Sequence, residues 1–458
     1  MDRNNRELLM RIILGIFLIA SPGAFSGCGG GGGGGGNTHV TKSGDVVWTQ
    51  TNNPSLIDDQ PYGMIISGSN MYVVGFDSNT TLLDDQWHIE KRNLSDGSPV
   101  ASFGATTPGV VVSNPSSTSI NSFDDAYAVA ADSTAMYIVG FDSTAGDDDW
   151  AWHIEKRDLG TGNLVTSFGS GTGGGSISEN ISAGLDDAAF AVAVDSSPTG
   201  TMYIVGYTTT LSQGAEWQIE ARDKATGLVV SSVTSSISIA GDYANAIAID
   251  PAEGYMYVVG TDSVSHNYGW RIEKRTLSAP LSLETITFGG STGFIHEDPS
   301  IGPDEPLAIV LDPTFMYIAG YEASGATVRW RIEKRRRSDG SLETTSFGGA
   351  GKGYVVSNTT TNAAANAIAI DSNYMYVAGY DNTASGDLEW RIEKRDLTTG
   401  ALDAAFGNNG VYTNAFDATA SLWDNISAIA VDASYIYVAG YESTSNSDSR
   451  WRIEKIVK

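Results

Sequence analysis

The chain has few of the residues on which disulfides, thiolate metal sites and nucleic-acid interfaces depend. Its 458 residues include one cysteine, five histidines and 27 Lys and Arg against 54 Asp and Glu, for a formal net charge of -27. A single cysteine excludes an intramolecular disulfide and thiol-based zinc or haem attachment, because these need paired cysteines. Excess negative charge repels nucleic acid, so we expect no nucleic-acid partner. The acidity can serve solubility, a basic partner or cations.

Long apolar runs and amphipathic helices are also scarce. The apolar run near the start, Ile12 to Ala20, follows Arg3, Arg6 and Arg11. It is too short to span a bilayer and is typical of a signal peptide. Beyond it, Tyr, Val, Ile, Trp and Thr cluster in short alternating runs separated by Gly, Ser, Asn and Asp. This composition predicts an all-β chain.

Residues 25–28 read Phe-Ser-Gly-Cys and precede eight glycines, Gly29 to Gly36. The small residues before the cysteine resemble a bacterial lipobox, although Phe25 stands where Leu is usual. That resemblance implies cleavage before Cys28, lipids on Cys28, and a bacterial envelope location at the outer membrane or cell surface. Membrane contact would be by the lipid anchor only. An ordinary secretory signal with a chance cysteine is the alternative. The expected organisation is a signal peptide over 1–27, a lipidated cysteine and Gly-rich tether over 28–43, and a folded domain over 44–458.

One strand pattern, Met-Tyr-x-x-Gly with Ile replacing Met in the last copy, recurs seven times. A small-residue run precedes each copy, and a Trp-x-Ile-Glu run and a short apolar stretch follow it. That last stretch ends in Phe-Gly in most copies but not in the third. Four strands per unit in seven copies predict a seven-bladed β-propeller with four antiparallel strands per blade. The glycines that end the pattern are Gly75, Gly140, Gly206, Gly260, Gly320, Gly379 and Gly440.

The two ends of the chain predict how the ring closes. The seventh repeat stops at Lys458, directly after its third strand. A candidate for the missing fourth strand lies near the N-terminus, where Val46 to Thr49 resembles the fourth strand of the first repeat. We therefore expect an N-terminal strand to close the last blade.

The repeat itself resembles the bacterial delta-60 β-propeller repeat. The resemblance is carried by Tyr-Val-Ala-Gly-Tyr at 376–380, Arg-Ile-Glu-Lys-Arg at 391–395, Phe406-Gly407 and Gly410-Val411. It covers nearly the whole mature chain and implies an exported bacterial propeller without indicating an activity. The heavier use of Trp at the third strand and the degenerate third unit depart from the family pattern.

No catalytic residue stands out from the repeat. His88 and His153 occupy a slot that holds Gln or Arg in the other copies, which indicates a half-exposed polar position. The third strand keeps a Glu in every copy, and we expect these residues to form exposed interblade salt bridges with neighbouring Arg residues. They are Glu90, Glu155, Glu220, Glu273, Glu333, Glu393 and Glu454.

Two acidic series are the candidate binding residues. One follows the strand-two glycine, is broken by Thr208, and comprises Asp77, Asp142, Asp262, Glu322, Asp381 and Glu442. The other precedes the first strand, is broken by Ala363, and comprises Asp59, Asp124, Asp187, Asp242, Asp304 and Asp424. In an antiparallel blade both positions belong to the same face. The series fit turn-forming residues, or an acidic face that binds a basic partner or cations. No loop has a calcium-binding pattern, so no cofactor is expected and calcium is only an alternative.

The leading functional hypothesis is an envelope-anchored, non-enzymatic binding or scaffolding module that uses this long-loop face for a protein or carbohydrate partner. One alternative is a hydrolase or lyase with a site at the mouth of the central channel. The segment Gly289 to Pro306, which contains His296, Glu297 and Asp298, is where a break in the repeat would support it. A second alternative is a structural or adhesion protein of the surface, which would self-associate.

Overall fold

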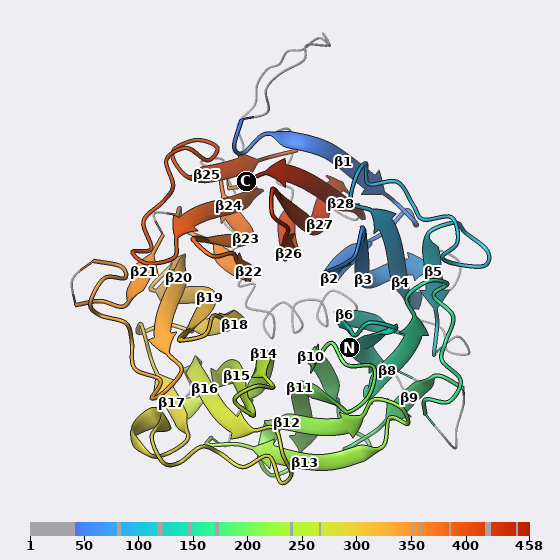
Figure 1. Ribbon diagram of the computed structural model, residues 1–458, viewed down its shortest axis with the longest axis horizontal. Coiled ribbons are helices and arrows are strands. Elements are labelled where there is room, and N and C mark those ends of the chain that lie inside the picture. The colour runs from blue at the N-terminus through green and yellow to red at the C-terminus, as the bar shows by residue number, and fades with distance from the viewer. Residues whose placement is uncertain are drawn as a thin grey trace. The chain divides into compact units, whose positions relative to one another are not determined.

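The computed structural model describes residues 42–458 except 80–83, 117–121, 144–148, 170–173, 239–240, 265–266, 350, 358, 384–385, 417–422 and 446–447. The strands form seven four-stranded antiparallel sheets arranged around an axis (Figure 1). The predicted all-β, seven-bladed propeller is confirmed. Cys28, the signal peptide and nearly all of the tether lie outside the described residues. No helix in the described part of the chain is long and apolar enough to cross a membrane.

Each blade runs outward from an innermost strand, and the chain passes from one blade to the next around the ring. The strands are, by blade, β2 (Gln60–Ser67), β3 (Asn70–Asn79), β4 (Asp84–Asn93), β5 (Val110–Ser113); β6 (Asp125–Ala131), β7 (Ala135–Asp142), β8 (Ala151–Asp158), β9 (Ser176–Glu179); β10 (Ala188–Val194), β11 (Thr201–Thr210), β12 (Gly214–Asp223), β13 (Val229–Ser235); β14 (Tyr243–Asp250), β15 (Tyr255–Asp262), β16 (Gly269–Thr276), β17 (Phe294–Glu297); β18 (Glu305–Leu311), β19 (Phe315–Ser324), β20 (Thr327–Arg336), β21 (Tyr354–Val356); β22 (Ala364–Ile370), β23 (Tyr374–Asn382), β24 (Leu388–Asp396), β25 (Val411–Asn414); and β26 (Asn425–Val431), β27 (Tyr435–Ser445), β28 (Asp448–Val457).

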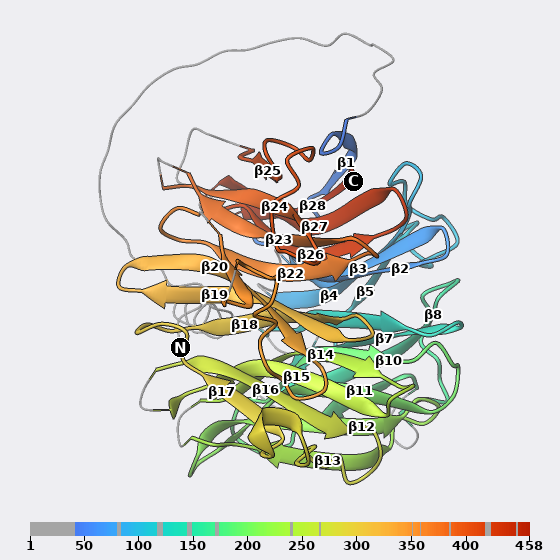
Figure 2. The same cartoon turned by 60° about the vertical axis from the view of Figure 1, so that its left-hand side comes forward.

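The seventh blade takes its outer strand from the other end of the chain. Strand β1 (Val46–Asn52) pairs antiparallel with β28, from Val46 opposite Ile456 to Asn52 opposite Trp451. Figures 1 and 2 show β1 lying along β28. The predicted closure is confirmed, and the strand extends three residues beyond the expected Thr49. The ring is therefore held by pairing between its two ends.

A tryptophan at the start of each third strand joins neighbouring blades. Trp87 Nε1 donates to the carbonyl of Phe141 in the next blade at 3.3 Å. The same bond recurs around the ring, and Trp451 of blade seven donates to Phe76 of blade one at 3.1 Å. Burying these indoles requires a partner for each N–H, and the next blade provides it. The other donors are Trp152, Trp217, Trp270, Trp330 and Trp390.

The apolar core lies between blades. Trp87 and Phe103 of blade one pack with Ala126 and Met136 of blade two, and most other blade pairs repeat this arrangement. Small residues fit the innermost strands, where the blades crowd together, and large residues fill the wider spaces further out. Blade three has no Phe-Gly, and the corresponding cluster contains the fully buried Leu281 of blade four instead.

Candidate functional site

The aspartates that precede the innermost strands are buried and tie two loops together in each blade. Asp124 accepts hydrogen bonds from Ser116 N at 2.9 Å, from Ser116 Oγ at 2.6 Å and from Ser143 N at 3.2 Å. Ser116 belongs to the loop between blades, and Ser143 follows strand two. Each carboxylate therefore anchors the interblade loop to the loop between strands two and three. The same arrangement is formed by Asp59 with Ser55 and Ser78, Asp187 with Ser182 and Thr209, Asp242 with Ser238 and Ser263, Asp304 with Ser300 and Ala323, and Asp424 with Phe416 and Ser443.

Burial changes the acidity of these anchoring carboxyls. It raises the pKa of Asp59 and of Asp124 to about 7, against the weaker opposing effect of their hydrogen bonds. It raises the pKa of Asp304 and of Asp424 to about 6. These carboxyls therefore exchange protons near neutral pH while holding the loops.

Blade six, where Ala363 breaks this series, uses another residue for the same task. Asn382 Oδ1 accepts hydrogen bonds from Thr361 N and Asn362 N, both at 3.0 Å. Ala363 is fully buried. In blade six the anchoring side chain is therefore at the end of strand two and not in the interblade loop. Asn382 connects the two loops without the aspartate.

The acids that follow the strand-two glycine pair with the variable slot of strand three. Asp77 lies 2.7 Å from Nδ1 of His88, and Glu90 lies 3.1 Å from its Nε2. Burial disfavours a charged imidazole, but the hydrogen bonds to both carboxylates outweigh it and raise the pKa of His88 to about 9. Blade two repeats this arrangement with His153, whose pKa is also raised to about 9. In the later blades an Arg takes the slot, in Asp381–Arg391, Glu322–Arg331 and Glu442–Arg452.

These contacts correct the expectation that the slot is half-exposed. His88 and His153 are 2% and 3% exposed, so in blades one and two the slot carries a buried positive charge between two carboxylates. A buried cation without a carboxylate partner is strongly unfavourable. His and Arg can replace each other in the slot because both supply that charge. In blade three, where Thr208 replaces the acid, the slot holds the neutral Gln218, which donates to Glu220 at 2.9 Å.

The invariant strand-three glutamates also differ from expectation. Glu90 pairs with Arg92, two residues further along the same strand, at 2.5 Å. Glu333 forms the same contact with Arg335 at 2.6 Å. The salt bridges are therefore within a blade and buried, where loss of one partner costs about 3–5 kcal/mol. The contacts of these glutamates with the next blade come from outer-strand donors, as when Asn52 donates to Glu90 at 2.6 Å. In two blades the interblade contact is instead a salt bridge from Arg222 to Glu179 and from Arg335 to Glu297.

In the five blades that have both acids, the structure brings the two acidic series together but places their carboxylates inside the blade. The twelve candidate side chains are each less than 9% exposed and have internal partners. The expectation of an acidic outer surface made by these side chains is corrected: one series anchors the loops, and most members of the other pair with a buried His or Arg. Within the described residues, no group of three or more His, Cys, Asp or Glu side chains could hold a metal ion.

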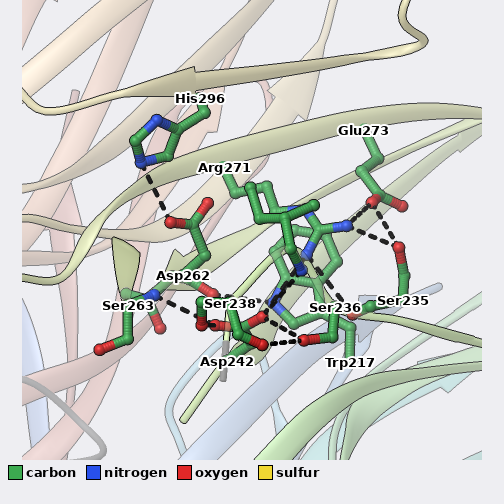
Figure 3. Close-up of polar contacts among 12 residues, drawn as sticks. Trp217, Ser235, Ser236, Ser238, Asp242, Asp262, Ser263, Arg271, Glu273 and His296 are labelled. Atoms are coloured by element: carbon green, nitrogen blue, oxygen red, sulfur yellow. Dashed lines mark hydrogen bonds and ion pairs between the residues drawn. The ribbon is translucent and has the colours of Figure 1, made fainter. Parts of the chain in front are cut away.

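Blade four breaks the pairing pattern (Figure 3). Arg271 stacks on Trp217 of blade three at 4.5 Å and donates to Ser235 Oγ at 2.6 Å, so it does not pair with Asp262. His296 on β17 replaces it, with Nε2 3.0 Å from Asp262. Burial raises the pKa of Asp262 to about 6, and the nearby His296 opposes the rise.

The His296 of this pair belongs to the segment Gly289 to Pro306, in which a break in the repeat would support an enzymatic site. Because β17 is the outermost strand of its blade, the pair lies away from the axis. His296 therefore does not lie at the mouth of the central channel, where the hydrolase or lyase alternative would place its site. His39 and His266 lie outside the described residues.

Around the axis, the innermost strands carry residues that sequence reasoning did not single out. Each of these strands has a register shift near its start, and in most blades the extra residue contacts the neighbouring blade. Tyr127 contacts Tyr62 at 5.1 Å and Phe190 at 5.3 Å between ring centroids. Asn245 donates to Glu305 at 2.9 Å, and burial raises the pKa of Glu305 to about 8. The signal in the sequence is one large or amide residue in six of the seven small-residue runs; the seventh has Ser427 at this position.

Exposed aliphatic side chains are found on the loops that the aspartates anchor. Leu211 and Ile301 are 94% and 87% exposed, and Ile237 and Val264 are each 38% exposed. Asp242 binds the backbone N–H of Ile237 and that of Ser263, which precedes Val264. These residues belong to loops of blades three to five on one face of the ring. Such side chains can contribute apolar contact area to a partner.

Comparison with known proteins shows similarity to solved structures of low sequence identity. No family model matches the chain, and no curated protein is similar to it in sequence. Sqt1 from Chaetomium thermophilum, bound to the N-terminus of ribosomal protein L10, has a TM-score of 0.46 at 9% identity, covering 91% of this chain and all of that chain. The β-propeller domain of the Trilobed protease from Pyrococcus furiosus has a TM-score of 0.38 at 10% identity, covering 90% and 94%. These scores carry no functional argument. The seven-bladed propeller fold is established by the strand pairing within the chain itself.

Proposed function

We propose that the protein is a non-enzymatic binding or scaffolding propeller of the bacterial cell envelope, related to the delta-60 repeat propellers. Lipids on Cys28 hold it to the membrane, and the face carrying the interblade loops binds a protein or carbohydrate partner. The observation that carries the proposal is the buried aspartate that joins two loops in six blades. Loops held in place before binding lose less conformational freedom on binding, which favours affinity.

The role of the acidic residues in this proposal is to position the face. Asp242 shows how this works, because it holds the backbone beside two exposed aliphatic residues, Ile237 and Val264. The partner then contacts loop side chains and backbone groups, and the buried carboxylates do not touch it.

The partner-binding proposal is tested by retention from envelope extracts on the immobilised unit Ser43–Lys458. Leu211→Asp and Ile301→Asp place charges on the loop face and are expected to reduce retention of a partner that the wild type holds. Ile286→Asp is the matched control, since Ile286 is 82% exposed but lies in the connection between strands three and four, on the opposite face. Equal retention by all variants, or no retained partner, would contradict the proposal.

The anchoring proposal is tested separately in the full-length chain. Cys28→Ser is expected to abolish labelling by a fatty-acid analogue and to move the protein from the membrane fraction to the soluble fraction. A membrane-bound, unlabelled Cys28→Ser protein would show that the lipid anchor is not what holds it.

A further inference from the structure

The outer strand of blade three differs from those of its neighbours. Strand β13 has seven residues, whereas β5, β9, β17, β21 and β25 have three or four. Its first two residues and the preceding Leu228 are apolar and exposed, with Leu228, Val229 and Val230 exposed by 60%, 43% and 54%. A long outer strand with exposed apolar residues is a template for pairing with another strand.

The degenerate third repeat explains this edge. In most other blades the segment between strand three and the outer strand first places a Phe between blades, and the outer strand that follows it is short. We call this segment the buried arm. In blade two, Gly169 N, just after the Phe of this arm, donates to Thr226 O of the next blade at 2.9 Å. Blade three has no Phe-Gly, so a tight turn closed by Gly227 N donating to Asp223 O at 2.8 Å leads directly into β13. The residues that elsewhere form the buried arm here extend the outer strand.

We propose that β13 is a dimerisation edge that pairs antiparallel with β13 of a second copy of this chain. Residues 228–235 carry no charge, although the chain has a net charge of -27. Two copies can therefore pair at this strand without placing carboxylates opposite each other. Like charges on directly opposed residues would destabilise the pair. In a pair centred on Ser232, Val233 faces Ser231 and Val230 faces Thr234 of the other copy. A two-fold pair of this kind uses each edge once and closes.

The other seven-residue outer strand, β1, is less suited to this contact. Its side chains reach toward blade one at two positions, since Gln50 donates to Asp96 O at 3.1 Å and Asn52 to Glu90 at 2.6 Å. Strand β13 makes the corresponding contact through its last residue, Ser235, which donates to Glu273 at 2.8 Å. Its exposed residues, Val46 and Val47, are 39% and 40% exposed, less than Leu228 and Val230.

Sedimentation velocity on the unit Ser43–Lys458 tests this edge. We expect a monomer–dimer equilibrium between about 1 and about 100 µM, the range for a small interface. Val230→Lys and Thr234→Lys should weaken dimerisation by on the order of tenfold or more, because Lys on an edge strand opposes pairing. Ile286→Lys, the matched control, should dimerise like the wild type, and all variants should keep its melting temperature.

A cysteine cross-link tests the register independently. The unit Ser43–Lys458 contains no cysteine. Ser232→Cys places one thiol from each copy at the two-fold axis, where directly opposed residues have Cα atoms about 4.5–5.5 Å apart, within disulfide range. Oxidation should give a covalent dimer, whereas Ile286→Cys should stay monomeric.

Several outcomes would overturn the proposal. A monomer at every concentration would exclude a second copy as the occupant. Lysine variants that dimerise like the wild type, or a dimer abolished only by Val46→Lys, would place the contact elsewhere. None of these outcomes bears on the loop face, so the dimer and the proposed partner-binding function stand or fall separately.

Discussion

Removing the closing strand is expected to destabilise the whole ring. The perturbation is a chain that starts at Asn53 and so lacks β1, compared with one that starts at Ser43. Strand β1 contributes six paired positions with β28. At about 1 kcal/mol net for each ladder hydrogen bond, its loss costs on the order of 6 kcal/mol. Removal of the half-buried Trp48, which packs 6.3 Å from Tyr437 between ring centroids, adds to this cost.

The expected change in melting temperature follows from the size of the unit. An unfolding entropy of about 2.1 cal/mol/K per residue gives a shift of roughly 1 °C per kcal/mol for a unit of this length. Calorimetry should therefore show Tm lower by about 7 °C or more in the shortened chain. A peptide of residues 43–53, added in excess, should restore part of the shift by mass action. An unchanged Tm would refute the reasoning that pairing of the two ends stabilises the ring.

Three further predictions concern the buried charges. The pKa of His88 and of His153 is raised from 6.5 to about 9, so the stability that their protonation adds is complete below pH 6.5 and is lost as the pH rises through 9. Tm should therefore fall between pH 6.5 and 9, and it should fall less in the double variant His88→Gln and His153→Gln. An equal fall in the variant would exclude these imidazoles as the cause. The pKa of Asp124 is raised from 3.8 to about 7, so its contribution to the unfolding free energy falls as the pH rises from about 4 to 7. Urea unfolding of Asp124→Asn should show a smaller fall of the unfolding free energy over this pH range. The same pH dependence in the variant and the wild type would contradict a buried, ionisable Asp124. Asn382→Ala removes the acceptor of two backbone N–H groups and should cost about 1–3 kcal/mol in the same assay, while a loss near zero would show that blade six needs no loop anchor.

The interblade contacts show why part of the candidate site was hidden in the sequence. The seven tryptophans and glutamates are visible as a repeat, but their hydrogen-bond partners are not. Asn52 reaches Glu90 across the ring closure, and Arg92 rather than an Arg of another blade neutralises that glutamate. The replacement of the anchoring aspartate in blade six is harder to see in the sequence. Ala363 stands where the aspartate would be, and Asn382, which anchors the loop instead, lies about 20 residues further along the chain. A repeat shows which positions matter, and the fold shows what each position contacts.

The sequence by itself determined the all-β class, the seven units of four strands and the N-terminal strand that closes the ring. These follow from local patterns, in which alternating apolar residues, small inner residues and turn residues recur at each copy. Only the tertiary structure decided that the acidic series are buried, that His88 and His153 carry buried charge, and that β13 is an exposed edge. The physical reason is that burial depends on how neighbouring blades pack. A carboxylate has the same sequence context whether its loop folds over it or leaves it in solvent.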